Sequence, residues 1–584
     1  MALAKAALLS SYMQMRTTGL PGSLPSVATL ATLATLATLL LGGCASTTAR
    51  APEPEAAIPG AGYHMLMAEI AARRGLQPVA AEEYLNAAER SDNPDESQRA
   101  AEFAFQYGFD SHALRAARRW AALAPADSSA RLYLVRLLVR RNDVEGAARQ
   151  AEAALGPAAQ RSDADYRQLA GELGEETNLE GVTRVWSRLA AGAPPLPALQ
   201  TALAAAALRS RDYDLALATA RAAIDPDIAW PTDNEAQAII GRALLARGDT
   251  AAALGQAREQ LAAQPGVESE LEYASLLATA ERNDEALAVL TALETRYGDQ
   301  PAIRRLHGLV SLAAEDYRGA WEQFSGLVSN DDYGDESYFH LAEIALHQEQ
   351  LETAIQMLAR IDGGAYLLAA RDTLARIAVA RGDVPSALQV LDSLAAQHPE
   401  LAFQAARRRA AILQKQGELQ QARAVLDDIL RYQPDDADLR LARGALLEQM
   451  GEVKPALADM EAAVALFPDN AMALNAYGYT LLNHGGRVAS ARPLIRRALE
   501  RQPEDPAILD SYGWLLYRQG RMDEARSYLA LAWSRLADPE VAAHLGEVLW
   551  KQGERDAARR LWDEALQAAP DSRPLRDTMQ RFLD

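Results

Sequence analysis

Residues 507–533 read A-I-L-D-S-Y-G-W-L-L-Y-R-Q-G-R-M-D-E-A-R-S-Y-L-A-L-A-W, and residues 541–570 read V-A-A-H-L-G-E-V-L-W-K-Q-G-E-R-D-A-A-R-R-L-W-D-E-A-L-Q-A-A-P. Each stretch holds two runs with apolar residues three or four positions apart, the spacing of one helix face. The first run ends at Gly520 or Gly553, where a helix end favours a left-handed residue. Pro570 closes a second run, because proline cannot continue a helix. Each stretch therefore predicts a pair of helices.

Small residues inside each pair predict a close approach between its two helices. Gly513 and Gly546 fall within the first helices, and Ala525 and Ala558 fall near the start of the second. These residues carry little or no side-chain bulk, so the paired helices can approach closely.

The same unit recurs along the chain with a mean period of about 34 residues. Glycine often stands five residues before the small residue that opens the second helix, and proline often stands twelve residues after it. A single pair of helices cannot bury its own apolar stripes, so neighbouring pairs must stack into a solenoid. The small residues that mark the units are Ala80, Ala113, Ala147, Gly181, Ala216, Ala253, Ala286, Ala320, Ala354, Ala387, Ala422, Ala456, Ala491, Ala525 and Ala558.

The period, the glycines and the stopping proline resemble those of the tetratricopeptide repeat (TPR). The match is strongest from residue 403 onward and weakest at 162–190, where Gly181 replaces alanine. The resemblance implies an all-α, right-handed superhelical solenoid of about 15 helix-turn-helix repeats. Prolines and the longest spacing between units predict a change of pitch or a hinge around 192–235. The predicted divisions are N-terminal repeats at 61–230, C-terminal repeats at 231–572 and a capping helix at 573–584.

The first 60 residues predict an export signal and a tether. Residues 27–41 form an uncharged apolar run, too short for a membrane-spanning helix, and Leu41-Gly42-Gly43-Cys44 follows it. The segment resembles a bacterial lipoprotein signal peptide at 1–43, which implies a lipidated Cys44 and a tether at 44–60. Gly42 departs from the usual motif, the leader is long enough for Met13 or Met15 to be the true start, and an ordinary signal peptide with a chance cysteine is the alternative. Because no aspartate follows Cys44, the resemblance implies the periplasmic face of the outer membrane.

Charge and composition argue against several classes of function. The formal net charge is −20, which disfavours nucleic acid or a lipid surface as the main partner, apart from the lipid anchor. One cysteine excludes an internal disulfide framework. His340 and His347 could share a helix face but lack a third metal ligand, so we expect no metal and no other cofactor. Common catalytic motifs are absent from the sequence, and we expect no enzyme activity.

In the tetratricopeptide family, defined positions of the first helix line a groove that holds extended peptides or partner helices. We carry these positions onto the last three units and call the resulting residues the C-terminal wall. Aromatic rings beside polar groups suit partner recognition, but Trp514 and Trp550 could equally pack against an adjacent helix. The C-terminal wall consists of Asn475, Tyr479, Asn483, Asp510, Trp514, Tyr517, Arg518, His544, Glu547, Trp550 and Lys551.

Together these features predict an outer-membrane-anchored periplasmic scaffold that binds envelope proteins during assembly or secretion. One alternative is a periplasmic accessory subunit of an exopolysaccharide export system. Another is an activator of a cell-wall enzyme, although few residues lie outside the repeats.

Overall fold

The computed structural model describes residues 60–224 and 233–583. Within these ranges the regular secondary structure is helical, and helices α2 to α31 form fifteen consecutive pairs that α32 follows. The predicted all-α solenoid of about 15 helix pairs is confirmed.

In fourteen of the pairs the second helix packs closely against the first. The two helices of the fourth pair instead pack mainly against the first helix of the fifth pair. The pairs are α2 (Ala61–Arg73) and α3 (Gln77–Glu89), α4 (Pro94–Gln106) and α5 (Asp110–Leu123), α6 (Ser128–Arg140) and α7 (Val144–Leu155), α8 (Asp163–Gly174) and α9 (Leu179–Ala191), α10 (Pro197–Arg209) and α11 (Tyr213–Ala223), α12 (Asp233–Ala246) and α13 (Thr250–Ala263), α14 (Val267–Thr279) and α15 (Asn283–Tyr297), α16 (Pro301–Ala313) and α17 (Tyr317–Ser325), α18 (Gly334–His347) and α19 (Leu351–Leu358), α20 (Leu367–Ala380) and α21 (Val384–Gln397), α22 (Ala402–Lys415) and α23 (Leu419–Tyr432), α24 (Ala437–Gln449) and α25 (Val453–Leu466), α26 (Ala471–Asn483) and α27 (Val488–Arg501), α28 (Pro506–Arg518) and α29 (Met522–Arg535), and α30 (Pro539–Lys551) and α31 (Arg555–Ala568), with α32 (Arg573–Leu583) after them.

The turn inside most pairs depends on one left-handed residue. The turn between α8 and α9 has none, and the turn between α26 and α27 has two, Gly485 and Gly486. Gly520 has φ 78° and Gly553 has φ 92°, as the sequence pattern requires. Several units lack glycine at this position and still adopt the same conformation, for example Asn142 at φ 58° and Glu315 at φ 63°. Packing of the two helices therefore imposes the turn even on residues that disfavour it.

The predicted close approach of paired helices is also present. A Cβ atom placed on Gly513 would lie 2.7 Å from Cγ of Leu529, and one on Gly546 would lie 1.9 Å from Nε1 of Trp562. Trp562 is fully buried, and its indole N–H donates to the carbonyl oxygen of Ala542 at 3.1 Å. Glycine in the first helix therefore makes room for a large side chain of the second.

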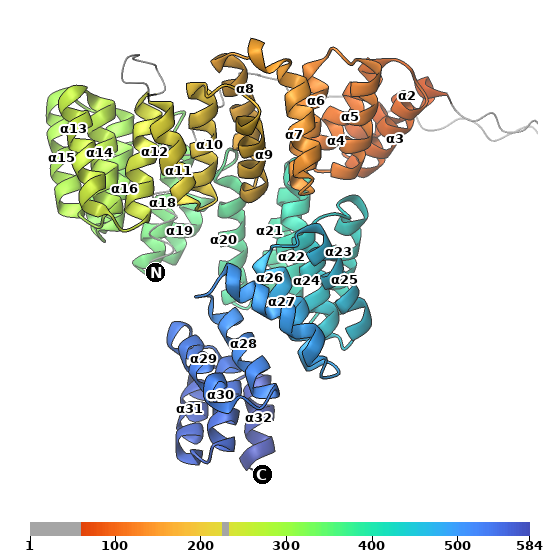
Figure 1. Ribbon diagram of the computed structural model, residues 1–584, viewed down its shortest axis with the longest axis vertical. Helices are drawn as coiled ribbons and strands as arrows, with labels where there is room; N and C mark the ends of the chain where they lie inside the picture. The colour runs from red at the N-terminus through yellow and green to blue at the C-terminus, as the bar shows by residue number, and fades with distance from the viewer. Residues whose placement is uncertain (1–59, 225–232, 584) are drawn as a thin grey trace, which may run out of the picture.

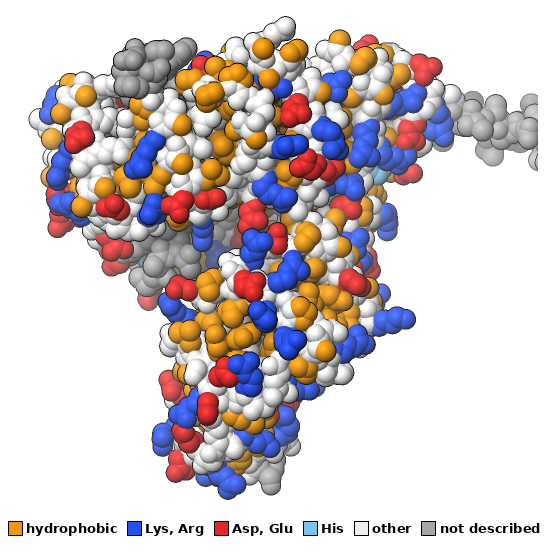
Figure 2. Space-filling model, viewed as in Figure 1, with side chains coloured by type: hydrophobic (Ala, Val, Ile, Leu, Met, Phe, Trp, Pro, Cys, Tyr) orange, Lys and Arg blue, Asp and Glu red, His pale blue; other side chains and the backbone are white. Residues whose placement is uncertain are grey.

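The solenoid turns back on itself instead of running as an open spiral (Figure 1). Helices α2 to α16 form an upper row, the chain then returns beneath this row, and α28 to α32 extend away from it. The returning helix α23 contacts α5, which lies far earlier in the sequence. On the face shown in Figure 2, basic and acidic side chains are interspersed over both parts.

We call the contact between the upper row and the returning repeats the clasp. Its centre is aromatic: the Phe109 ring centroid lies 5.3 Å from that of Phe403 and 5.2 Å from that of Tyr432, both at near-perpendicular angles. The His112 ring lies 6.2 Å from Tyr432, and burial lowers the pKa of His112. Such edge-to-face pairs add stability beyond the burial of apolar area.

Polar contacts surround the aromatic centre of the clasp. Arg141 Nη1 lies 2.8 Å from a carboxylate oxygen of Asp435, and Asn142 Nδ2 donates to the carbonyl oxygen of Leu466 at 3.3 Å. Burial raises the pKa of Asp110 at the edge of the same contact. The clasp therefore joins the second and third helix pairs to the eleventh and twelfth.

Helix α32 covers the last pair. Leu575 is fully buried, and the ring of Phe582 lies 6.0 Å from those of Trp550 and Trp562. Charged residues face outward between these apolar contacts, as a terminal cap of a solenoid requires.

Two sequence predictions concern residues outside the described ranges. The predicted signal peptide and Cys44 precede residue 60, and the predicted change of pitch around 192–235 includes residues 225–232. Helices α11 and α12, on either side of the latter segment, pack against each other. These predictions stay untested. Every helix in the part of the chain that the structure describes is too short or too polar to cross a bilayer.

Candidate functional site

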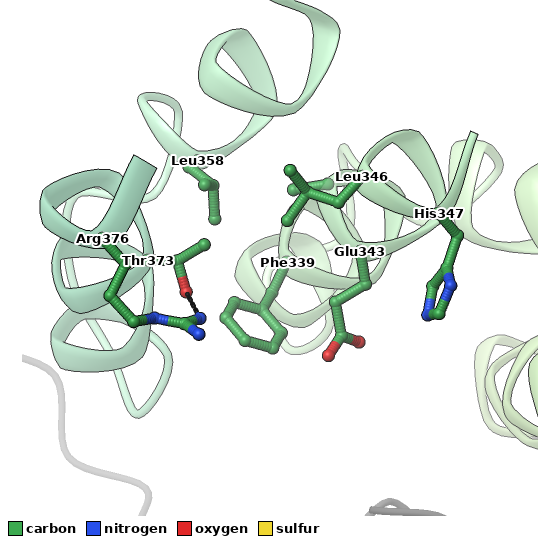
Figure 3. Close-up of a pocket in the computed structure, with 8 residues that line it drawn as sticks. Phe339, Glu343, Leu346, His347, Leu358, Thr373 and Arg376 are labelled. Atoms are coloured by element: carbon green, nitrogen blue, oxygen red, sulfur yellow. Dashed lines mark hydrogen bonds between the residues drawn. The ribbon is translucent and has the colours of Figure 1, made fainter. Parts of the chain in front are cut away.

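A pocket of about 300 Å³ lies between the first helices of two consecutive units, α18 and α20 (Figure 3). Counted from Ala354 and Ala387, several of its residues occupy the positions that the tetratricopeptide resemblance assigns to a partner-binding groove. We call it the middle pocket. It is lined by Phe339, Ala342, Glu343, Leu346, His347, Leu358, Thr373 and Arg376.

The middle pocket combines an apolar floor with charged edges. Figure 3 shows Phe339 and Leu346 of α18 facing Thr373 and Arg376 of α20. Arg376 donates to Oγ1 of Thr373 at 3.1 Å. A guanidinium, a carboxylate and apolar surface within one pocket can hold an apolar side chain and pair with polar groups beside it.

Glu343 and His347 form the opposite edge of the middle pocket. The Glu343 carboxylate lies 2.8 Å from Nδ1 of His340, which ties it to the interior of the repeat. His347 stacks on Tyr317 of the preceding unit, with ring centroids 5.3 Å apart. Glu343 is therefore held by a residue of its own helix and His347 by the preceding unit, so the pocket is formed in advance of any partner.

A buried layer of charge supports α18 behind the pocket. Arg305 of α16 donates to both carboxylate oxygens of Glu336, at 2.5 and 2.6 Å. Burial alone would raise the pKa of Glu336, but His340 and Arg305 outweigh it and lower the pKa to about 2. Burial would likewise lower the pKa of His340, but Glu336 and Glu343 outweigh it and raise that pKa. The layer fixes the position of α18 relative to α16.

The structure brings the residues of the C-terminal wall together on α26, α28 and α30. His544 Nδ1 lies 2.9 Å from a carboxylate oxygen of Asp510, and its ring stacks on Trp514 with centroids 4.1 Å apart. The Trp514 indole N–H donates to Asn483 at 3.0 Å, and Trp514 is only 8% exposed. Trp514 therefore packs between repeats, as the alternative interpretation of its sequence position describes.

Other wall residues also form contacts between units. The Tyr479 hydroxyl hydrogen-bonds to Glu540, and burial together with this carboxylate raises the pKa of Tyr479 well above its ordinary value. Tyr517 donates to Glu547 at 2.8 Å, and Arg581 of the capping helix donates to the other oxygen of Glu547. These contacts occupy groups that a partner would otherwise use.

The remaining wall residues differ in how accessible they are. Arg518 and Lys551 are exposed, and Trp550 is half-buried against Trp562. Asn475 is buried, and its Oδ1 has no hydrogen-bond partner among the described residues. Partner binding by the wall stays a prediction.

Sequence reasoning did not select the middle pocket. The groove positions were applied to the last three units, although Phe339, Glu343 and His347 occupy the same positions in an earlier unit. Applying the positions to every unit would have named these three residues. It would not have shown that they enclose a pocket, because that depends on the spacing between α18 and α20.

The described residues form no cluster of three or more histidines, cysteines, aspartates or glutamates placed to hold a metal ion. His340 is paired with carboxylates and His347 lies at the pocket edge, so the two do not converge on a common point.

The fold defines a helix-pair repeat protein with a pocket between two of its first helices. Two models of the family described as tetratricopeptide repeat match the chain, one at residues 201–268, 441–506 and 484–540 and the other at 378–446. These matches show that the chain contains tetratricopeptide repeats, and its fifteen helix pairs agree with them. Such repeats are typical of protein-interaction scaffolds.

Part of the chain is similar in sequence to a known protein. It is 35% identical over 212 residues to TPR repeat-containing protein PA4667 of Pseudomonas aeruginosa, an alignment that covers 36% of each chain. The chain thus spans about a third of the length of this curated relative.

Solved structures with similar helix pairs include three repeat chains. TTC0263, a thermophilic TPR protein of Thermus thermophilus, is 22% identical, with 31% of this chain and 99% of that chain covered and a TM-score of 0.29. A chain of the APC/C hetero-tetramer Cut9-Hcn1 is 15% identical, with 90% and 96% covered and a TM-score of 0.32. PilF of Pseudomonas aeruginosa is 18% identical, with 37% and 97% covered and a TM-score of 0.30.

Proposed function

We propose that the chain is an outer-membrane lipoprotein that faces the periplasm and binds envelope proteins without catalysing a reaction. The observation that carries the binding part is the middle pocket, which is formed from groove positions of two consecutive first helices. The anchoring part rests on Cys44, the single cysteine of the chain, which follows the apolar run 27–41.

The pocket chemistry defines the partner segment. Phe339, Leu346 and Leu358 provide apolar surface for one anchoring side chain. Arg376 pairs with an acidic group of the partner, and Glu343 accepts from a backbone or side-chain N–H. The partner therefore presents a peptide or helix with an apolar residue next to an acidic one.

Site-specific photo-crosslinking in intact cells tests this binding site. A photoreactive amino acid at position 339 should crosslink to an envelope protein, and Arg376→Glu in the same chain should abolish the crosslinked product. The matched control places the same amino acid at Leu531, which is exposed on a second helix, α29.

Equal crosslinking from positions 339 and 531, or no effect of Arg376→Glu, would exclude the middle pocket as the partner site. The C-terminal wall is tested separately with Arg518→Ala and Lys551→Ala, because both residues are exposed. Trp514→Ala is a poor test, since Trp514 is buried between repeats and its loss disturbs packing.

The anchor is tested by incorporation of radiolabelled palmitate. Wild type should be labelled and should fractionate with the outer membrane, whereas Cys44→Ser should be unlabelled. Label retained by the variant would refute lipidation at Cys44.

A further inference from the structure

The N-terminal end of the solenoid carries a concentration of exposed apolar side chains. Of the nine large hydrophobic residues that are exposed among the described residues, four lie between positions 63 and 79. They are Tyr63 at 52% exposure, Leu66 at 60%, Leu76 at 49% and Val79 at 46%. Tyr63 and Leu66 belong to α2, Val79 belongs to α3, and Leu76 lies in the turn between them.

The exposed residues of α2 follow one helix face. Tyr63 and Leu66 are three residues apart, and the partly exposed Met67 and Ile70 continue the stripe at spacings of four and seven from Tyr63. Arg73 and Arg74, both exposed, end the same stripe. The opposite face, with His64, Ala68 and Ala71, is buried against the rest of the repeat.

The position of α2 in the fold explains why no helix within residues 60–224 and 233–583 lies against this face. In a solenoid each first helix stacks on the preceding unit, and α2 belongs to the first unit that the structure describes. After the last pair, α32 covers the apolar face that would otherwise be exposed. Its Leu575 is buried while its charged residues face outward. The outward stripe of α2 is apolar instead. An exposed apolar stripe of this kind indicates that another apolar surface covers it.

Two exposed arginines and the length of chain before α2 identify that surface. Arg73 and Arg74 end the apolar stripe, although the first helix pair as a whole, residues 61–89, also contains Glu69, Glu82, Glu83 and Glu89 and has a net charge of −2. The predicted tether from Cys44 to Gly60 has a reach of roughly 20–25 Å as a random coil. A lipid anchor at Cys44 therefore holds α2 close to a bilayer, and an anionic headgroup complements the two arginines.

We propose that the outward face of α2, with Leu76 and Val79, lies in the lipid interface beside the anchor. This inference rests on the proposed lipidation of Cys44. Tyr63 suits the boundary between headgroups and acyl chains, because its ring is apolar and its hydroxyl is polar. Arg73 and Arg74 extend their charged ends toward the headgroups while their stems lie along the apolar surface.

The consequence is a fixed orientation of the scaffold. Helix α2 is at one end of the upper row, so seating it on the membrane directs the row away from the lipid, while helices α28 to α32 extend to one side of the row (Figure 1). An anchor attached through a tether alone would leave the solenoid free to rotate and would not present the middle pocket in one direction.

The test uses the full-length lipidated chain, reconstituted in vesicles of phosphatidylethanolamine and phosphatidylglycerol. Lipidation consumes the thiol of Cys44, so a single introduced cysteine is the only site for an environment-sensitive fluorophore. The test variant is Leu66→Cys, and the matched control is Met472→Cys, which is 49% exposed on α26 in the C-terminal half.

The label at position 66 should be quenched by nitroxide lipids at a depth of about 5–10 Å and protected from aqueous iodide, as for an interfacial helix. The label at position 472 should show the reverse. If the chain stays on the vesicles while both labels are equally open to iodide, the anchor holds and the docking of α2 is wrong.

Three other outcomes also overturn the proposal and differ from one another. If the chain does not associate with the vesicles and Cys44 is labelled by the fluorophore, Cys44 is not lipidated. Both the anchor and the docking of α2 are then wrong. Protection of position 66 without vesicles that increases with protein concentration shows that a second copy covers α2. Protection without vesicles at every concentration shows that an N-terminal segment of the same chain covers it.

Discussion

Gln433 Nε2 donates a hydrogen bond of 2.7 Å to the carbonyl oxygen of Gly108, a residue 325 positions earlier in the chain. The bond belongs to the clasp, where Phe109 packs against Phe403 and Tyr432. A solenoid stabilises itself mainly through contacts between adjacent repeats. The clasp adds a contact between distant repeats and closes the helix pairs between them into a ring.

We expect Gly108→Ala to open the clasp. Gly108 has φ 76°, and an added Cβ would lie 3.0 Å from Cδ2 of Phe403 and 3.2 Å from Nε2 of Gln433. The left-handed backbone alone costs alanine about 1–2 kcal/mol, and the contacts with Phe403 and Gln433 add to this. The radius of gyration from small-angle scattering should increase.

Gly75→Ala is the matched control for the clasp. Gly75 has φ 72° at the equivalent turn, but nothing lies within 4 Å of an added Cβ. This variant should lose a similar amount of backbone stability and keep the radius of gyration of wild type. An unchanged radius in both variants would show that the ring stays closed without the Gln433 contact.

We expect Gly546→Ala to destabilise the last two repeats strongly. The added Cβ would overlap the indole of Trp562, which is fully buried and has no free space to move into. Overpacking of this kind costs about 1–3 kcal/mol. Amide hydrogen exchange in α30 and α31 should become faster, and a normal exchange rate there would contradict the close helix approach.

Gly171→Ala provides the comparison for Gly546→Ala. Gly171 lies in α8, and nothing lies within 4 Å of an added Cβ. Alanine has a higher helix propensity than glycine, so this variant should gain up to about 1 kcal/mol.

The ion pair of Glu336 with Arg305 should make the stability around α16 and α18 depend on pH at the acid end. Burial opposes the charged form, but His340 and Arg305 outweigh it, so the folded-state pKa of Glu336 is about 2 against an ordinary 4.5. The folded state therefore binds fewer protons, and its stabilisation is present above pH 4.5 and lost as pH falls toward 2. The contribution is on the order of 3 kcal/mol.

Glu336→Gln tests this dependence. The free energy of local opening from hydrogen exchange in α16 and α18 should decrease near neutral pH. The difference from wild type should shrink as the pH falls from 4.5 toward 2. Glu352→Gln, at an exposed position of α19, should show neither effect. A pH-independent difference between Glu336→Gln and wild type would contradict the lowered pKa.

His544 should give the C-terminal repeats the opposite dependence. Burial lowers its pKa, but Asp510, Glu540 and Glu547 outweigh burial and raise it above 6.5. The folded state binds the additional proton, so the stabilisation is fully present below pH 6.5 and is lost as pH rises through the folded-state pKa. The imidazole titration by nuclear magnetic resonance should lie above 6.5, and His544→Gln should remove the loss of stability on the alkaline side. A titration midpoint at or below 6.5 would contradict the raised pKa.

Much of the fold was predictable from the sequence because its signals are local. The period, the glycine at the turn and the small residues of each pair all act within one unit, and the structure has the fifteen pairs where the spacing predicts them. The C-terminal wall was predictable as a set of neighbours for the same reason, since equivalent positions of stacked repeats lie next to one another. What each wall residue contacts was not predictable. Trp514, for example, stacks on His544 of the next unit, and that depends on side-chain packing.

The sequence by itself determined that the chain folds as paired helices in a row, because helix periodicity and turn residues specify each unit without reference to distant ones. Only the tertiary structure decided where distant repeats meet in the clasp and where the middle pocket lies. Small rotations between successive repeats add up along the chain until Gln433 reaches Gly108, and neither residue carries a signal for the other. The middle pocket arises in the same way, because the space between α18 and α20 is set by the helices that hold them apart.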